Sequence, residues 1–117
     1  MAGNPDFDLY QLSPEHLELR AAVRALALDK IAPRAAEIDE TGEFPWAGYE
    51  ALAASGFHAI SIPEEYEGSG GDNLAACIVV EEVARVCGSS SLIPAVNKLG
   101  TTPILVGGGE AIKQRYL

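Results

Sequence analysis

A loop rich in glycine and acidic residues, positions 56–73, lies between two apolar segments and constrains the fold more than any other part of the sequence. Gly56 can close the preceding helix in the left-handed conformation because it has no Cβ. Asp72 or Asn73 can cap the helix that follows. We therefore expect an ordered connection that turns sharply between two helices. Two aromatic side chains of this loop are expected to pack inward: Phe57 and Tyr66.

The composition is that of one globular domain, which we assign to residues 1–117. Hydrophobic residues make up 48% of the chain and charged residues 21%, which argues against disorder. The formal net charge is −9, and such a chain repels phosphate backbones, so nucleic acid is excluded as a partner. The apolar runs are short and interrupted, so no membrane span is predicted, and the N-terminus does not have the pattern of a secretory signal.

Five helical segments are predicted, and the first contains a proline in its interior. Ser13 can cap this helix and Pro14 suits its first position. Apolar residues at spacings of three and four continue on both sides of Pro33, in a shifted register. Pro33 removes the hydrogen bond to the carbonyl of Asp29. We expect one long helix bent near Pro33, and the alternative is a full break into two helices.

The second and third helices flank the loop. The second is expected to start at Pro45 and to end at Gly56. Its predicted inward stripe consists of Trp46, Tyr49, Leu52 and Ala53. The third covers about 74–86 and is apolar almost all round over 74–80, which is typical of a helix surrounded by others. We expect the remaining helices to pack around it.

The fourth and fifth helices complete the chain. Residues 88–91 are expected to form a boundary in which serines act as a cap, followed by a helix over 92–106. Three glycines, 107–109, separate it from a helix over 110–117. This last segment has no closing glycine, so we expect the chain to be a fragment, truncated or cleaved, of a longer protein. Such a fragment should expose apolar surface and self-associate.

No residue pattern predicts a catalytic or metal site. Glu81 and Glu82 point about 100° apart on a helix, so we expect one to be solvated and the other to hold an arginine such as Arg85. His16 and His58 have no second histidine or cysteine at metal-ligand spacing, so no metal is predicted.

The two cysteines are predicted to remain reduced. Cys77 and Cys87 are expected in the same helix, about 15 Å apart along its axis, which is too far for a disulfide. We expect both to be buried thiols of a protein in a reducing cytoplasm.

Several motifs occur in an order that identifies a family. They are a Phe-Pro helix start at 44–45, a Leu-x-x-x-Gly helix end at 52–56, an Ile-Pro-Glu-Glu-Tyr-x-Gly-x-Gly-Gly loop at 62–71, and Glu-Glu-Val-Ala-Arg at 81–85. Together they resemble the N-terminal helical domain of the acyl-CoA dehydrogenases. The resemblance extends from residue 9 to residue 117 and implies an all-α bundle.

The resemblance also implies a function for the full-length protein. Acyl-CoA dehydrogenases use FAD and a carboxylate base to oxidise the Cα–Cβ bond of acyl-CoA thioesters to 2-enoyl-CoA. Electrons leave through an electron-transfer flavoprotein, and family members are usually homotetramers. The base and most flavin contacts belong to the two later domains. We therefore expect no catalytic and no cofactor-binding residue in this fragment, which should be inactive alone.

In this family the N-terminal domain supplies one wall of the acyl-chain pocket. The matching helix implies four substrate-binding residues: Leu92, Ala95, Val96 and Leu99. Their spacing of three and four would, from the pattern alone, favour a core stripe instead. Two alternatives remain for the whole chain. Acyl-CoA oxidases and flavin monooxygenases share this architecture, so the chain could instead be the N-terminal domain of one of these enzymes. From a different class, it could be a non-enzymatic helical interaction module.

Overall fold

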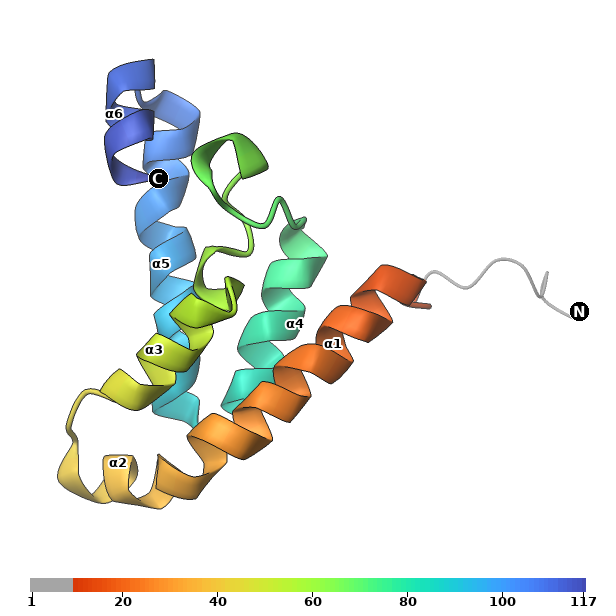
Figure 1. Cartoon of the computed structure of the whole chain (residues 1–117), viewed down its shortest axis with the longest axis vertical. Coiled ribbons are helices and arrows are strands. Elements are labelled where there is room, and N and C mark those ends of the chain that lie inside the picture. The colour runs from red at the N-terminus through yellow and green to blue at the C-terminus, as the bar shows by residue number, and fades with distance from the viewer. Residues whose placement is uncertain (1–9) are drawn as a thin grey trace, which may run out of the picture.

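The computed structural model describes residues 10–117, and this part of the chain is helical without any strand (Figure 1). The α-helices are α1 Pro14–Leu26, α2 Ala35–Thr41, α3 Trp46–Ala54, α4 Asn73–Ala84, α5 Gly88–Gly107 and α6 Glu110–Tyr116. The predicted all-α fold class is confirmed.

The 28 residues from Pro14 to Thr41 form one continuous but bent helix. Between α1 and α2 the chain forms a π-helical turn, Ala27–Ile31, and a 3₁₀ turn, Ala32–Arg34. The N–H of Ala32 donates to the carbonyl of Ala27, five residues back. This irregular pattern accommodates Pro33, which has no N–H to donate. The predicted long helix with a bend near Pro33 is confirmed, and α2 turns away from the line of α1 (Figure 1).

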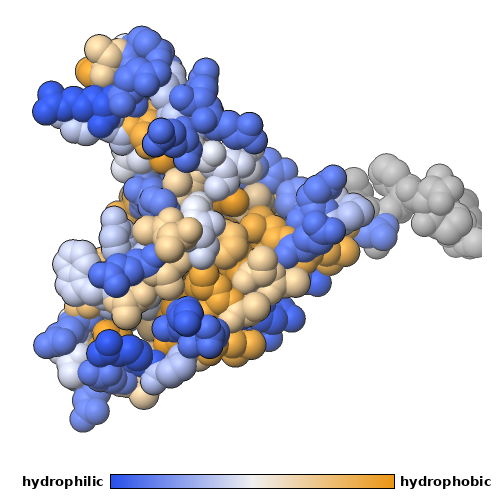
Figure 2. All heavy atoms as spheres, in the orientation of Figure 1, coloured by the Kyte–Doolittle hydropathy of each residue, from blue (hydrophilic) through white to orange (hydrophobic). Residues whose placement is uncertain are grey.

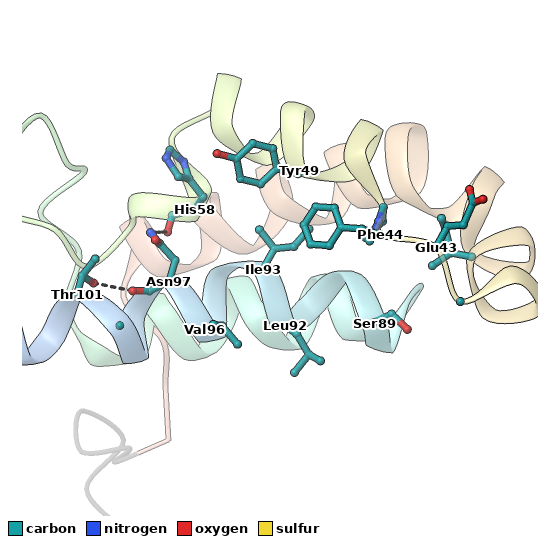
Figure 3. A pocket seen from close by; sticks show the side chains of 14 residues that line it. Glu43, Phe44, Tyr49, His58, Ser89, Leu92, Ile93, Val96, Asn97 and Thr101 are labelled. Atoms are coloured by element: carbon teal, nitrogen blue, oxygen red, sulfur yellow. Dashed lines mark hydrogen bonds between the residues drawn. The ribbon is translucent and has the colours of Figure 1, made fainter. Parts of the chain in front are cut away.

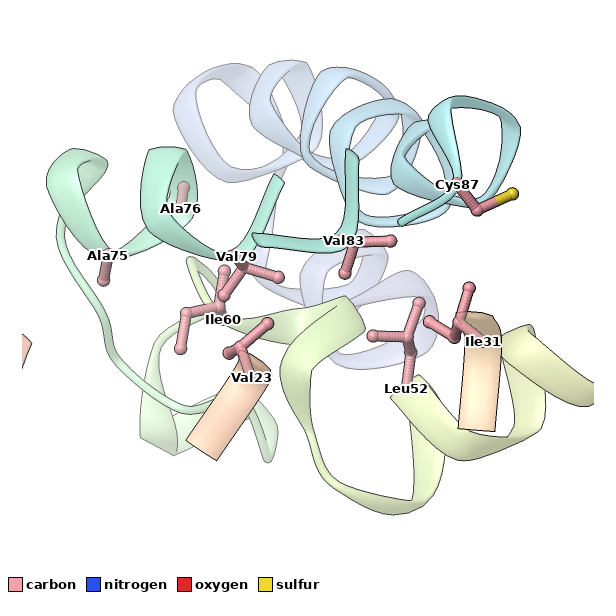
Figure 4. Close-up of a cluster of buried hydrophobic side chains, with 9 residues drawn as sticks. All are labelled: Val23, Ile31, Leu52, Ile60, Ala75, Ala76, Val79, Val83 and Cys87. Atoms are coloured by element: carbon pink, nitrogen blue, oxygen red, sulfur yellow. The ribbon is translucent and has the colours of Figure 1, made fainter. Parts of the chain in front are cut away.

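The core lies where α4 meets its neighbours. α4 packs mainly against α1 and α5, and α3 packs against α5 and the π-helical turn. Figure 4 shows the buried cluster, which consists of Val23, Ile31, Leu52, Ile60, Ala75, Ala76, Val79, Val83 and Cys87. α6 packs mainly against α5, so the expectation that all other helices surround α4 is not met.

Apolar side chains also remain at the surface. Figure 2 shows hydrophobic residues gathered on one face between α1 and α3. α4 likewise exposes Leu74 and Cys77, although the sequence predicts a helix covered all round. The predicted burial of Cys77 is therefore wrong, while Cys87 is buried. Cys87 does not belong to α4 but precedes α5, and both thiols are free.

The glycine-rich loop is ordered by backbone hydrogen bonds. Gly56 has φ +74°, as predicted for a left-handed helix end. The N–H of Gly71 donates to the carbonyl of Ile60 at 2.7 Å, and that of Gly70 to the carbonyl of Ile62 at 2.9 Å. These bonds satisfy backbone N–H and C=O groups that do not take part in an α-helix or a sheet.

The two aromatic residues of the loop differ in burial. Phe57 packs against the core, as predicted. Tyr66 is half-buried, and its hydroxyl donates to the carboxylate of Glu110 on α6 at 3.0 Å. Burial and this hydrogen bond raise the pKa of Tyr66. Tyr66 therefore anchors the loop to α6 rather than to the core alone.

The inward face of α3 differs from the prediction. Leu52 is fully buried, but Trp46 is 65% exposed and Tyr49 38% exposed, so these two do not form an inward stripe. The residue that shares the buried side with Leu52 is Gly48, four positions earlier, and a Cβ there would meet Ser90 and Ile31 at 3.6 and 3.7 Å. The small glycine lets α3 approach α5 closely, which turns the large aromatic rings outward.

α5 starts earlier than predicted. It begins at Gly88 instead of Leu92, and its cap is Cys87, whose Sγ accepts the N–H of Ser90 at 3.5 Å. The serines are not the cap but form the first turn. Ser91 donates its hydroxyl to the carbonyl of Gly88 at 2.6 Å, and this internal bond makes the serine compatible with a helix start.

A polar network joins the starts of α1 and α4. Ser13 caps α1 as predicted, and Asp72 caps α4 by accepting the N–H of Ala75 at 2.7 Å. His16 lies between them, with Nδ1 2.7 Å from Ser13 Oγ and Nε2 3.0 Å from Asp72 Oδ1. The N–H of Ala75 and the ring of His16 lower the pKa of Asp72.

This network predicts a loss of stability in acid that depends on Asp72. Because its pKa is lower in the folded state, ionised Asp72 stabilises the fold above its ordinary pKa of about 3.9, and this contribution is lost as the pH falls below that value. Asp72→Asn keeps a capping oxygen but cannot ionise. We expect the melting temperature of the variant to lie below that of the wild type at pH 7 and to approach it near pH 3. Melting curves that stay equally separated from pH 7 to pH 3 would contradict this role.

Candidate functional site

A cleft of about 710 Å³ lies between α3, the connection from α2 to α3, and α5. Its volume falls in the range of small-molecule sites. Figure 3 shows the lining residues, which are Ile38, Gly42, Glu43, Phe44, Pro45, Tyr49, His58, Ser89, Leu92, Ile93, Val96, Asn97, Gly100 and Thr101.

The middle of the cleft is apolar on both sides. α5 contributes Leu92, Ile93 and Val96, which lie on one face because a helix turns every 3.6 residues. Phe44 and Tyr49 lie opposite these residues. The ring centroids of Phe44 and Tyr49 are 6.3 Å from each other. Such walls favour an apolar ligand, whose burial contributes about 25 cal/mol per Å² of apolar surface.

At one end of the cleft, polar groups from two elements are joined by hydrogen bonds. Asn97 donates from Nδ2 to the backbone carbonyl of His58 at 2.8 Å, and the hydroxyl of Thr101 donates to the carbonyl of Asn97 at 2.7 Å. Figure 3 shows these three residues together, far from Glu43 and Ser89 at the other end. The hydrogen bond from Asn97 joins α5 to the loop after α3 and so holds this end of the cleft in place.

The four residues predicted to bind substrate do not all reach this cleft. Leu92 and Val96 line it and are 59% and 57% exposed. Leu99 is 73% exposed and Ala95 is half-buried, and neither belongs to the lining. From their spacing alone, these four residues would be expected in the core. Three of them, Leu92, Val96 and Leu99, are exposed, so they do not form a core stripe.

Sequence reasoning missed the neighbouring row of α5. Ile93, Asn97 and Thr101 recur every four residues and line the cleft. The spacing was visible, but two polar residues interrupt the apolar pattern. The opposite wall, Phe44 and Tyr49, could not be assigned to the same site because it comes from α3 and the connection before it.

The lining of the cleft is mostly apolar. Among residues 10–117, no group of three or more His, Cys, Asp or Glu side chains is placed to hold a metal ion. In the same part of the chain, no helix has the length and hydropathy needed to cross a membrane. What the arrangement can do is hold an apolar chain between α3 and α5.

Comparison with known proteins gives one family. Residues 13–117 match the family model described as acyl-CoA dehydrogenase, N-terminal domain. A probable acyl-CoA dehydrogenase of Mycobacterium tuberculosis is 58% identical over 116 residues, which are 99% of this chain and 30% of that protein. A probable acyl-CoA dehydrogenase of Bacillus subtilis is 39% identical over 92% of this chain and 29% of its own length.

A third relative has a more specific description. The cyclohex-1-ene-1-carbonyl-CoA dehydrogenase of Syntrophus aciditrophicus is 37% identical over 92% of this chain and 26% of its own length. The chain thus spans less than a third of the length of these relatives.

Proposed function

The chain belongs to the acyl-CoA dehydrogenase family, and from this membership we propose that the full-length protein oxidises the Cα–Cβ bond of acyl-CoA thioesters to 2-enoyl-CoA. The support is the match over residues 13–117 and the dehydrogenase descriptions of relatives in three genera. The proposal concerns the full-length protein because this chain covers about 30% of such a relative.

Within that enzyme, this domain forms one wall of the acyl-chain pocket. The observation that supports this role is the cleft, whose middle is apolar on both sides. Leu92 and Val96 contact the acyl chain there, and Ile93 lies beside them on the same wall. Ala95 and Leu99 would contact substrate only if its acyl chain extended beyond the residues that line this cleft.

FAD is proposed for the full-length enzyme, and the residues described here do not fit it. The phosphates of a dinucleotide are usually held by a glycine-rich turn that leads from a strand into a helix. Residues 10–117 contain no strand. The charged side chain that lines the cleft is Glu43, which would repel phosphate. We therefore assign neither a flavin contact nor the carboxylate base to this part of the chain.

The remaining features of the proposal come from the family resemblance. Electrons pass to an electron-transfer flavoprotein, and the enzyme is a homotetramer in the cytoplasm. Two free thiols, Cys77 and Cys87, agree with a reducing compartment. The alternatives within the family architecture are an acyl-CoA oxidase and a flavin monooxygenase, which an assay with oxygen as the acceptor would distinguish.

Enlarging Val96 should shorten the acyl chains that the full-length enzyme accepts. Phenylalanine at this position would fill the apolar middle of the cleft, where one methylene of substrate is worth about 1–3 kcal/mol. For Val96→Phe we expect the ratio of kcat/KM for long over short acyl-CoA to fall at least about 10-fold. The measurement is steady-state oxidation of saturated acyl-CoAs of increasing length with an artificial electron acceptor.

Leu28→Phe is the matched control because Leu28 is an exposed leucine that lies outside both the cleft and α5. It should leave the preference for chain length unchanged. Equal losses on all chain lengths in Val96→Phe would contradict the assignment of this wall, and no oxidation of any acyl-CoA by the wild type would overturn the proposed reaction itself.

A further inference from the structure

The ring of His58, at one end of the cleft, has no hydrogen-bond partner among residues 10–117. The residue lines the cleft and is half-buried. Its Nδ1 is the single buried side-chain nitrogen or oxygen in residues 10–117 that makes no hydrogen bond. Buried polar atoms of folded proteins are nearly always paired, because an unpaired one loses its hydration without compensation. This nitrogen therefore indicates that a further group binds here.

Two more unpaired polar groups face this end of the cleft from other elements. The hydroxyl of Tyr49, on α3, makes no hydrogen bond within residues 10–117 and points toward the ring of His58 in Figure 3. Asn97, on α5, donates from Nδ2 to the backbone carbonyl of His58, and this bond fixes the amide while its Oδ1 remains able to accept. An imidazole, a phenol and an amide oxygen therefore lie at the same end of the cleft.

These groups are poorly matched to a saturated acyl tail but well matched to one that carries a hydroxyl. A methylene chain at this end would remove water from the three groups and return no hydrogen bond. A hydroxyl both donates and accepts, so it can pair with the amide oxygen of Asn97 and with the ring of His58 together, whereas a ketone oxygen only accepts. Apolar walls with a few polar groups that orient the ligand are typical of small-molecule sites.

The charges of the cleft argue against an anionic tail. Among the described residues that line it, none is a lysine or an arginine, and Glu43 supplies a carboxylate. A carboxylate on the ligand would therefore lose its hydration without gaining a cation as partner. A neutral hydroxyl does not carry that cost.

We propose that His58, Tyr49 and Asn97 form a subsite for a hydroxyl group of the acyl chain, so that the preferred substrates are hydroxyacyl-CoA thioesters. The hydroxyl lies beyond Cβ, because Cα and Cβ lose hydrogen in the proposed reaction. This inference rests on the proposed function, since it takes the acyl chain to lie in this cleft. His58 determines specificity in this assignment and takes no part in the oxidation.

A series of hydroxyacyl-CoAs of one chain length, with the hydroxyl on successive carbons beyond Cβ, tests the subsite in the full-length enzyme. We expect kcat/KM to exceed that of the saturated thioester by about 10-fold or more at one hydroxyl position, because a site built to pair a hydroxyl rejects the analogue that lacks it. The CoA thioester of the dicarboxylic acid of the same length should be the poorest substrate. A series in which no hydroxyl position exceeds the saturated thioester would overturn the inference.

Substitutions assign the preference to particular residues. His58→Leu should lower the ratio of kcat/KM for the best hydroxyacyl-CoA over the saturated thioester by about 10-fold or more, and Tyr49→Phe, which removes only a hydroxyl, should lower it in the same direction. Tyr66→Phe is the matched control, since the hydroxyl of Tyr66 is bonded to Glu110 outside the cleft. An unchanged ratio in both His58→Leu and Tyr49→Phe would mean that another part of the protein, not the substrate, occupies this end, and the inference would be wrong.

Binding measurements separate a failure of this inference from a failure of the proposed reaction. Calorimetric titration of the full-length enzyme with the same thioesters needs no turnover. Binding of one hydroxyacyl-CoA about 10-fold more tightly than the saturated thioester, with this advantage lost in His58→Leu, would support the subsite even if no acyl-CoA were oxidised. Oxidation of saturated acyl-CoAs together with equal binding of all the thioesters would leave the proposed reaction standing and refute the subsite.

Discussion

Gly68→Ala is expected to destabilise the fold more than any other substitution considered for this chain. A Cβ at this position would lie 2.0 Å from the carbonyl oxygen of Ile62 and 2.4 Å from its carbonyl carbon. Because both are backbone atoms, no side-chain rotation can relieve the overlap, and the turn at 62–71 must open. We expect the free energy of unfolding to fall by about 3 kcal/mol or more, at the upper end of single substitutions. Urea unfolding followed by circular dichroism measures it.

Gly100→Ala is the matched control for the added methyl group. Gly100 lies within α5, and a Cβ there would meet no atom within 4 Å. Alanine should therefore raise the free energy of unfolding by about 0.5–1 kcal/mol, through its better helix propensity. Equal stability changes in the two variants would mean that the turn tolerates a side chain at Gly68.

Local signals explain which parts of the fold could be predicted from the sequence. The cap at Ser13, the bend near Pro33 and the left-handed Gly56 each depend on a few neighbouring residues and are present in the structure. The orientation of α3 depends instead on contact with α5, where Gly48 rather than Trp46 faces inward. Hydrophobicity alone favours burial of Trp46, so the pattern pointed to the wrong side of the helix.

In the candidate site, too, features within one helix could be predicted and contacts between elements could not. The sequence placed Leu92 and Val96 on one face of a helix, and both line the cleft. It could not show that the opposing wall comes from Phe44 and Tyr49, nor that the hydrogen bond from Asn97 to the loop closes one end. Those features depend on how elements distant in the sequence meet, and periodicity within one helix contains no information about them.

The acidic pair on α4 illustrates the limit most clearly. Glu81 is solvated and Glu82 is 3% exposed, as expected for one solvated and one paired acid. Its principal partner, however, is Arg24 on α1, with hydrogen bonds of 2.8 and 2.9 Å, while Arg85 lies at 3.5 Å. The sequence favours Arg85 because it is three residues away, but the hydrogen bonds from Arg24 join α1 to α4.

Glu82→Gln should therefore weaken the contact between α1 and α4. Glutamine keeps the shape of the side chain but loses the charge that both nitrogens of Arg24 contact. We expect the free energy of unfolding to fall by about 2 kcal/mol at pH 7, less than for a fully buried pair, because the side chain of Arg24 is 44% exposed and can be solvated. Thermal and urea unfolding of Glu82→Gln measures the effect. Glu81→Gln, at the exposed neighbouring position, is the control and should change the free energy of unfolding by less than about 0.5 kcal/mol.

The pH dependence of stability distinguishes the contribution of the charge of Glu82 from the contribution of its packing. The hydrogen bonds from Arg24 hold the pKa of Glu82 below its ordinary value. Ionised Glu82 therefore stabilises the fold above its ordinary pKa of about 4.3, and this stabilisation disappears as the pH falls through the lower pKa of the folded state. Glu82→Gln has no such titration, so the stability difference between wild type and variant should shrink steadily as the pH is lowered from 6 to 3. A difference that stays constant over that interval would mean that Glu82 stabilises the contact by shape and hydrogen bonding alone, without a contribution from its charge.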